Sequence, residues 1–151
     1  MRVRRLFALA ALCALLALAA GCGRGGSDPA NLKEGDCFDV PTNADRIDNL
    51  AKRGCNGQHG AEVFYVFDDD SPSGATYPTD PEWGQLIYPV CDPVFETYTG
   101  TPVAERSDID YKYLVPTADR WRSGDRQVTC FITSLDGKPL DRSFRVAPLA
   151  S

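Results

Sequence analysis

The sequence has few of the residues and motifs on which enzymes depend. Its 151 residues include a single histidine, His59, and it contains no Gly-x-Ser-x-Gly, no Ser-x-x-Lys and no phosphate-binding glycine loop. A lone histidine leaves little for a nucleophile–histidine–acid triad. Glycosidase chemistry by paired carboxylates stays open, because 21 acidic residues are present, but no spacing singles out a pair. The sequence therefore favours a protein that is not an enzyme.

The cysteines lack the spacing that metal and thiol-redox motifs have. No Cys-x-x-Cys occurs, whereas zinc sites usually contain closely spaced ligand pairs. Cys55, His59 and Glu62 fall within eight residues and offer sulfur, nitrogen and oxygen, but without such a pair we expect no metal and no cofactor. Asp68–Asp70 lacks the alternate spacing and distal glutamate of a calcium loop, so it is expected to be a solvated loop.

Positive charge is scarce. The chain has 16 Lys and Arg against 21 Asp and Glu, and loss of residues 1–21 leaves 13 basic residues and a net charge of −8. Such an acidic body repels phosphate backbones. We therefore expect no nucleic-acid partner.

No apolar run is long enough to span a bilayer permanently. The cationic start Met1–Arg5 is followed by fifteen uncharged, mostly apolar residues at 6–20. As a helix they would cover about 22 Å, short of the roughly 30 Å hydrocarbon core. This is the tripartite pattern of a bacterial export signal over residues 1–21.

The segment Leu18–Cys22 resembles a lipobox, in which a signal peptidase cleaves before a cysteine that carries a diacylglyceryl group. That pattern usually has leucine three residues before the cysteine, where this chain has Ala19. The resemblance implies a lipoprotein with acyl chains such as palmitate on Cys22, held at the extracytoplasmic face of the plasma membrane. Residues 22–31 are glycine-rich and would be the anchor and a flexible tether. A plain secretory cleavage is the alternative.

Four cysteines remain in the exported domain: Cys37, Cys55, Cys91 and Cys130. An even number in an exported chain predicts two disulfides, for which three connectivities are possible. We favour Cys37–Cys55, which brackets a turn-rich segment, with Cys91–Cys130, which ties a helix-like segment to a strand. On the chain-entropy model these loops would stabilise the domain by about 3 and about 4 kcal/mol.

Strand patterns stand on both sides of one helical pattern. Ala61–Phe67 is a continuous run of strand-favouring residues, which predicts burial on both faces. Asp136-Gly137 is a hairpin signal, with 143–146 as the returning strand. Further expected elements are an extended segment at 32–41 with Cys37 and Val40 in the core, a helical turn at 43–49, and strands at 109–115 and 127–135, the latter with Val128, Cys130 and Ile132 on one face.

Apolar residues from Trp83 to Tyr98 recur at three- and four-residue steps, and Gly100 follows them. Pro89 and Pro93 each remove a backbone donor, so we expect a kinked helix or two short ones. Residues 32–148 are thus predicted to form a small single α+β domain with a mainly antiparallel sheet, one kinked helical segment and two disulfides.

Three motifs, in this order and spacing, resemble the septum-formation domain family of high-GC Gram-positive bacteria over roughly residues 32–136. They are Gly35-Asp36-Cys37-Phe38, then Cys55 with His59-Gly60-Ala61-Glu62-Val63, and then Trp121-Arg122-Ser123-Gly124-Asp125-Arg126 before Cys130. The chain departs from the family at the helix prolines and at Gln58. The resemblance implies an extracytoplasmic domain associated with cell division, without an established reaction.

His59 and Glu62 are candidates for a proton-transfer pair, although strand positions three apart face opposite sides. The simpler interpretation is that the His59 imidazole forms a hydrogen bond with the Cys55 loop and that Glu62 forms an ion pair with an arginine. Two interpretations suit Trp121, Asp125 and Arg126. They form a structural corner of the fold, or they bind a ligand on which the tryptophan stacks and whose carboxylate or sugar the arginine hydrogen-bonds.

The sequence as a whole favours a non-enzymatic envelope lipoprotein, a binding or scaffolding module for division or wall-synthesis proteins. That function predicts an exposed apolar patch near Trp121, Trp83 or Tyr77. A binder of small ligands or wall glycans would have a pocket instead. A wall-acting hydrolase would have a cleft with convergent carboxylates, or with His59 and a perturbed acid.

Overall fold

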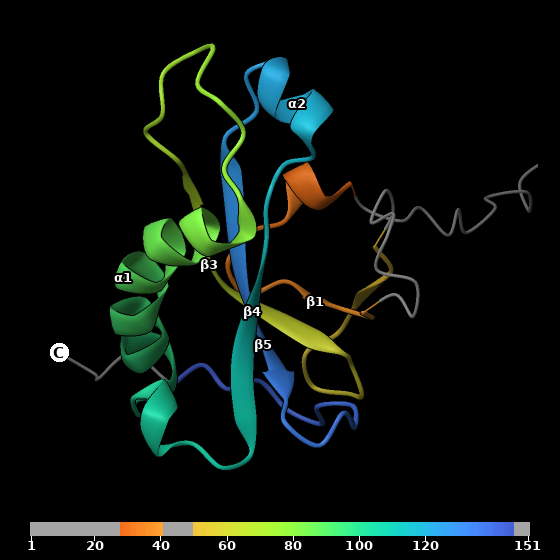
Figure 1. Cartoon of the computed structure of the whole chain (residues 1–151). Helices are drawn as coiled ribbons and strands as arrows, with labels where there is room; N and C mark the ends of the chain where they lie inside the picture. Colours follow the sequence, from red (N-terminus) through yellow and green to blue (C-terminus); the bar gives the residue numbers. More distant parts are fainter. Residues whose placement is uncertain (1–27, 41–49, 147–151) are drawn as a thin grey trace, which may run out of the picture.

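The computed structural model describes residues 28–40 and 50–146. Five strands form one antiparallel sheet in the order β2-β1-β3-β5-β4, and a long helix, α1, packs beside β3 (Figure 1). The elements are η1 (Pro29–Asn31), β1 (Cys37–Phe38), β2 (Lys52–Arg53), β3 (Ala61–Asp68), α1 (Asp80–Thr99), η2 (Val103–Glu105), β4 (Ile109–Leu114), α2 (Ala118–Arg122) and β5 (Gln127–Ser134). The predicted α+β class is confirmed. None of the helices in the described part of the chain has the length and apolar character needed to cross a membrane.

The main core lies between α1 and the sheet. The helix contributes one buried stripe, and β5 contributes Val128, Cys130 and Ile132, which face the same core as predicted. Phe64 of β3 stands edge-on to Phe95 of α1, with ring centroids 5.5 Å apart. Large apolar side chains therefore fix the helix against the sheet.

A smaller core covers the first half of β3 on the opposite face. Residues 61–64 are buried on both faces, as the continuous apolar run predicted, whereas 65–67 are only half-buried. The reason is the short pairing with β1, which reaches only Ala61 and Glu62. The members of this smaller core are Leu32, Phe38, Leu50, Ala61, Val63 and Phe131.

Helix α1 is continuous through both of its prolines, so the alternative of two short helices is wrong. A capping box between Thr79 and Glu82 begins the helix, and Gly100 ends it with a φ of 75°. Pro89 and Pro93 lie on the exposed side. The buried stripe and the Cys91–Cys130 disulfide hold the middle of the helix on the sheet despite the two missing donors.

Both predicted disulfides are confirmed. Cys37 pairs with Cys55 and Cys91 pairs with Cys130, with Cα–Cα distances of 5.4 and 6.6 Å. The first joins β1 to the loop after β2, and the second joins α1 to β5, which lies between β3 and β4 in the sheet.

The returning strand predicted at 143–146 is wrong. After the turn at Gly137, the chain makes a single bridge between Leu140 and His59 and then runs to the end of α1, where the Val146 N–H donates to the Tyr98 carbonyl at 2.8 Å. The edge of β4 away from β5 thus has no partner strand among the described residues.

Two further expectations are corrected, and two lie outside the described residues. Val40 is 44% exposed and not part of the core. Helix α2 forms where no helix was predicted, because Thr117 caps it by accepting from the Arg120 N–H. The helical turn at 43–49, and the signal and lipobox with Cys22, fall in parts of the chain that the structure does not describe.

Candidate functional site

Glu62 lies at the start of β3 and is fully buried. Its carboxylate accepts hydrogen bonds from the Tyr98 hydroxyl at 2.8 Å, the Ser143 hydroxyl at 2.5 Å and the Phe144 N–H at 2.8 Å. One side chain therefore connects β3, α1 and the C-terminal segment. The predicted arginine partner is wrong, because all three donors are hydroxyl or backbone groups.

Tyr98 shows the electrostatic consequence of this contact. Burial raises the pKa of its phenol, and the hydrogen bond to the Glu62 carboxylate raises it further. The phenol therefore keeps its proton and remains a donor to Glu62.

His59 is 1% exposed and lies two residues before β3 begins. Its Nδ1 is 2.7 Å from the carbonyl oxygen of Gly57, in the Cys55 loop as expected. Since a carbonyl only accepts, the neutral imidazole carries its proton on Nδ1 and has a lone pair on Nε2. That buried Nε2 has no hydrogen-bond partner in the described structure.

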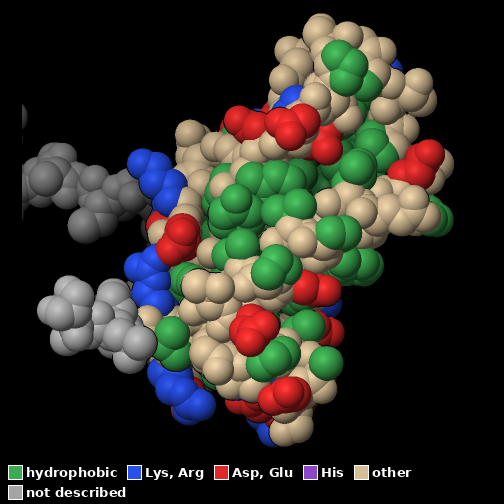
Figure 2. Space-filling model, turned by 90° about the vertical axis from the view of Figure 1, so that its left-hand side faces the viewer, with side chains coloured by type: hydrophobic (Ala, Val, Ile, Leu, Met, Phe, Trp, Pro, Cys, Tyr) green, Lys and Arg blue, Asp and Glu red, His purple; other side chains and the backbone are tan. Residues whose placement is uncertain are grey.

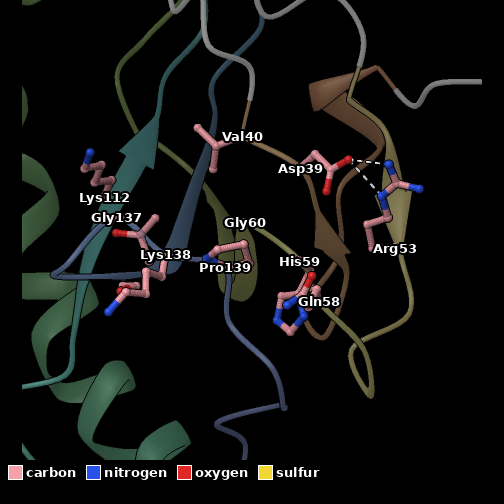
Figure 3. Close-up of a pocket in the computed structure, with 12 residues that line it drawn as sticks. Asp39, Val40, Arg53, Gln58, His59, Gly60, Lys112, Gly137, Lys138 and Pro139 are labelled. Carbon is pink, nitrogen blue, oxygen red and sulfur yellow. Dashed lines mark hydrogen bonds and ion pairs between the residues drawn. The ribbon is translucent and has the colours of Figure 1, made fainter.

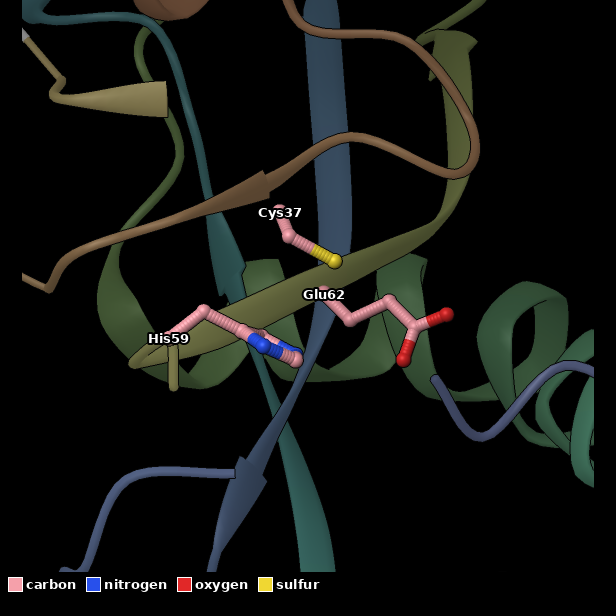
Figure 4. A group of neighbouring side chains, drawn as sticks. All are labelled: Cys37, His59 and Glu62. Carbon is pink, nitrogen blue, oxygen red and sulfur yellow. The ribbon is translucent and has the colours of Figure 1, made fainter. Parts of the chain in front are cut away.

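Cys37, His59 and Glu62 form a buried cluster, shown in Figure 4. The Cys37 sulfur, one imidazole nitrogen and one carboxylate oxygen lie within 4.8 Å of one another. Strand alternation does not separate His59 from Glu62, because His59 precedes the strand and is held by its bridge to Leu140. In the sequence the histidine and glutamate lie close to Cys55, whereas the residue inside the cluster is the disulfide partner of Cys55, Cys37.

The cluster lies inside the fold. His59 and Glu62 are buried, and the carboxylate is engaged by three donors. A general acid or base must reach the proton that it transfers, directly or through one water. Glu62 is enclosed by its three partners, whereas His59 also lines a pocket near the end of β1.

Trp121, Asp125 and Arg126 form the structural corner that was one of their two interpretations. The indole of Trp121 is buried and donates to the Ala75 carbonyl at 2.8 Å. The Arg126 guanidinium lies 3.8 Å above the indole and also donates to four backbone carbonyls. Asp125 pairs with Arg120 at 2.7 Å. These groups are engaged inside the fold.

The two tryptophans themselves contribute almost no exposed surface. Trp83 and Trp121 are both buried, and Tyr77 packs edge-on against each of them. Exposed apolar side chains lie along one side of α1, where Leu86, Pro89 and Pro93 are exposed beside the half-buried Val90. We call these four residues the α1 flank.

Helical spacing places the α1 flank along one side of the helix, away from the buried stripe. Leu86 is 40% exposed, and the two prolines are exposed as well. Tyr65 and Phe67, half-buried at the far end of β3, pack on the same core as α1. Figure 2 shows hydrophobic side chains gathered on this face of the molecule, with acidic side chains at their border.

A sequence signal for the α1 flank was present. The helical segment has more apolar residues than one buried stripe can hold, and we assigned Leu86 and Val90 to the same stripe as Trp83 and Cys91. A helix with an apolar stripe wider than its core-facing side has apolar residues left for another contact.

A pocket of about 620 Å³ lies on the other side of the molecule, between the end of β1 and the turn after β5 (Figure 3). Gly60 is required beside it, because a Cβ there would come within 2.7 Å of the Val40 nitrogen. Polar and charged residues outnumber apolar ones among the residues that line it: Asp39, Val40, Arg53, Gln58, His59, Gly60, Lys112, Thr133, Ser134, Gly137, Lys138 and Pro139.

One protein family matches the chain. Its sequence model, described as septum formation, matches residues 34–149. No curated protein and no solved structure matches significantly. The match spans both disulfides, the His59–Glu62 segment and the Trp121 corner. The chain therefore belongs to the septum-formation family.

Proposed function

We propose that the protein is a lipid-anchored, non-enzymatic interaction module of the cell envelope, which acts in septum formation by binding a protein partner through the α1 flank. The observation that carries this proposal is the row of exposed apolar side chains on α1 of an acidic protein. A contiguous apolar area with a polar border is typical of interaction sites.

The chemistry of the α1 flank indicates the kind of partner. Leu86 and Val90 supply apolar contact, and the neighbouring prolines stiffen the surface. Acidic side chains border the hydrophobic area in Figure 2. A complementary partner has an apolar centre with Lys or Arg around it. An anionic lipid surface would be repelled.

The anchor limits where this partner lies. Five residues separate Cys22 from Asp28, where the described domain begins, and an extended chain of that length reaches only about 20 Å. A lipid on Cys22 would keep the domain that carries the α1 flank close to the membrane. Membrane-associated division or wall-synthesis proteins are therefore the partners that we propose.

Photocrosslinking on α1 tests this surface. A photoreactive amino acid at position 86 is expected to crosslink a membrane-associated protein in dividing cells. The matched control places the same amino acid at Gln85, which is also exposed but faces another side of the helix. Equal crosslinking from both positions, or none from position 86, would count against the α1 flank.

The lipid anchor has its own test. Cys22→Ala is expected to block lipidation and to leave the precursor uncleaved, because the peptidase acts only after the diacylglyceryl group is attached. Metabolic labelling with a palmitate analogue and the gel mobility of the product report both effects. A Cys22→Ala protein that is cleaved normally and secreted would contradict the proposal that the anchor is on Cys22.

The pocket favours a second candidate, a binder of wall glycans. Its polar lining includes Arg53, Lys112, Thr133 and Ser134, which can donate to sugar hydroxyls or carboxylates. Soluble wall-glycan fragments would then raise the Tm of the wild-type domain, by linkage, and raise that of Lys112→Glu less. Equal shifts in the two proteins, or no shift at all, would exclude the pocket.

A further inference from the structure

We propose that the Cys37–Cys55 disulfide masks a zinc site, which opens when the disulfide is reduced and is formed by Cys37, Cys55, His59 and Glu62. The set contains two thiolates, one imidazole and one carboxylate. All are ligands that Zn²⁺ accepts in a tetrahedral site.

The positions of three ligands carry the geometry. The donor atoms of Cys37, His59 and Glu62 already lie within 4.8 Å of one another, and all three residues are buried. Zinc–ligand bonds of about 2.0–2.3 Å put the ligand atoms of a tetrahedral site roughly 3.3–3.8 Å apart. A closure on the order of 1 Å is therefore sufficient.

His59 already has the form of a zinc ligand. Its Nδ1–H donates a hydrogen bond to the Gly57 carbonyl oxygen, 2.7 Å from Nδ1. Its buried Nε2 has no hydrogen-bond partner among the described residues. Metal-bound histidines typically donate their other ring N–H to a carbonyl or carboxylate in this way. A buried polar atom without a partner is costly, so ligation would relieve that cost.

Glu62 is positioned in a similar way. Its Oε1 accepts from the Tyr98 and Ser143 hydroxyls, whereas its Oε2 accepts, among the residues that the structure describes, only from the Phe144 N–H. A carboxylate oxygen has two lone pairs, so Oε2 keeps one for a metal. The three donors orient the carboxylate as supporting contacts do around metal sites.

The disulfide controls the site because a disulfide sulfur is not a thiolate. Cys55 is half-buried in a loop whose neighbours Gly54, Asn56 and Gly57 are exposed. A dithiol reductant can attack the Cys55 sulfur, expel the Cys37 thiolate and leave as a disulfide after its second thiol resolves the mixed disulfide. Two electrons and two protons pass from the dithiol to the cysteines, and zinc then displaces the thiol protons.

The Cys91–Cys130 disulfide is not expected to be reduced under the same mild conditions. Cys91 and Cys130 are both fully buried between α1 and β5, so a reductant reaches them only after the domain opens. Mild reduction would thus open the zinc site while the core disulfide remains. Oxidation would release the metal, which makes the site redox-dependent.

The test uses Cys55→Ser, which frees the Cys37 thiol without a reductant and leaves Cys91–Cys130 intact. Co²⁺ is the probe, because its thiolate charge-transfer and d–d absorption bands report sulfur ligation. We expect the variant to show both bands and to lose them when one equivalent of Zn²⁺ is added. Oxidised wild type is expected to show neither band.

A matched variant separates the site from a free thiol. His59→Gln in the Cys55→Ser background keeps the Cys37 thiol and removes the imidazole, so it is expected to weaken Co²⁺ binding at least tenfold. Equal binding with and without His59 would overturn the proposal, as would absence of the thiolate band from a folded Cys55→Ser protein.

If Cys55→Ser does not fold, the same test is made on the wild-type protein after a phosphine has reduced its Cys37–Cys55 disulfide. Circular dichroism would show that the reduced domain is folded, and the same Co²⁺ titration would follow. A folded, reduced wild type without the thiolate band would also overturn the proposal.

Discussion

Glu62→Ala is expected to destabilise the domain by about 3–5 kcal/mol, because it leaves one buried and two half-buried donors without their acceptor. The phenol of Tyr98, the hydroxyl of Ser143 and the N–H of Phe144 all donate to this carboxylate. In a domain of this size the loss corresponds to a fall in Tm of roughly 15 °C. Urea denaturation followed by circular dichroism measures the change.

Two control variants locate the effect. Glu62→Gln keeps the shape and one acceptor oxygen, so it is expected to cost about half as much as Glu62→Ala. Glu105→Ala removes an exposed acid in η2 and is expected to stay within about 0.5 kcal/mol of wild type. If Glu62→Ala also stayed within about 0.5 kcal/mol of wild type, the claim that Glu62 holds β3, α1 and the C-terminal segment together would be wrong.

Removal of the core disulfide is the second large effect. The Cys91→Ala/Cys130→Ala protein is expected to lose about 4 kcal/mol of unfolding free energy, since the disulfide closes a 39-residue loop. It should also lose helical signal, because Cys91 lies between Pro89 and Pro93, where two backbone donors are missing. Denaturation curves and far-ultraviolet circular dichroism measure the two losses.

The other disulfide supplies the comparison. Cys37→Ala/Cys55→Ala opens a loop of 18 residues and is expected to cost about 3 kcal/mol without loss of helical signal. Unchanged helicity in the Cys91→Ala/Cys130→Ala protein would show that packing alone holds α1 across its prolines.

Local patterns predicted much of the fold. The apolar run at 61–67 gives β3, the alternation of Val128, Cys130 and Ile132 gives one face of β5, and both disulfides join the cysteines that the sequence analysis paired. These features depend on residues close in sequence or on a small number of pairings. They are therefore accessible without knowledge of long-range packing.

The errors arise where distant segments compete. Residues 143–146 have a hairpin signal before them, but Ser143 and Phe144 donate to the buried Glu62 instead of pairing as a strand. A buried carboxylate needs donors, and this need outweighs the local signal. Continuity of α1 through Pro89 depends likewise on its contacts with the sheet.

The candidate site was only partly predictable. His59 and Glu62 were identified, but their meeting with Cys37 depends on the pairing of β1 with β3 and on the bridge to Leu140. The helical spacing of Leu86 and Val90 was evident, yet the exposure of Leu86 and the half-buried position of Val90 follow from which side of α1 the sheet covers. The sequence places residues on a helix, and the packing of the helix decides which of them remain for a partner.

The central claim is that the α1 flank binds a division or wall-synthesis protein at the membrane. Proximity labelling from the lipidated protein in dividing cells tests it most directly, with an unrelated domain on the same lipid anchor as control. We expect wild type and Gln85→Arg to label such proteins above the control, and Leu86→Arg to fall to the control level. Equal labelling by wild type and Leu86→Arg, or labelling by wild type no different from the control, would contradict the claim.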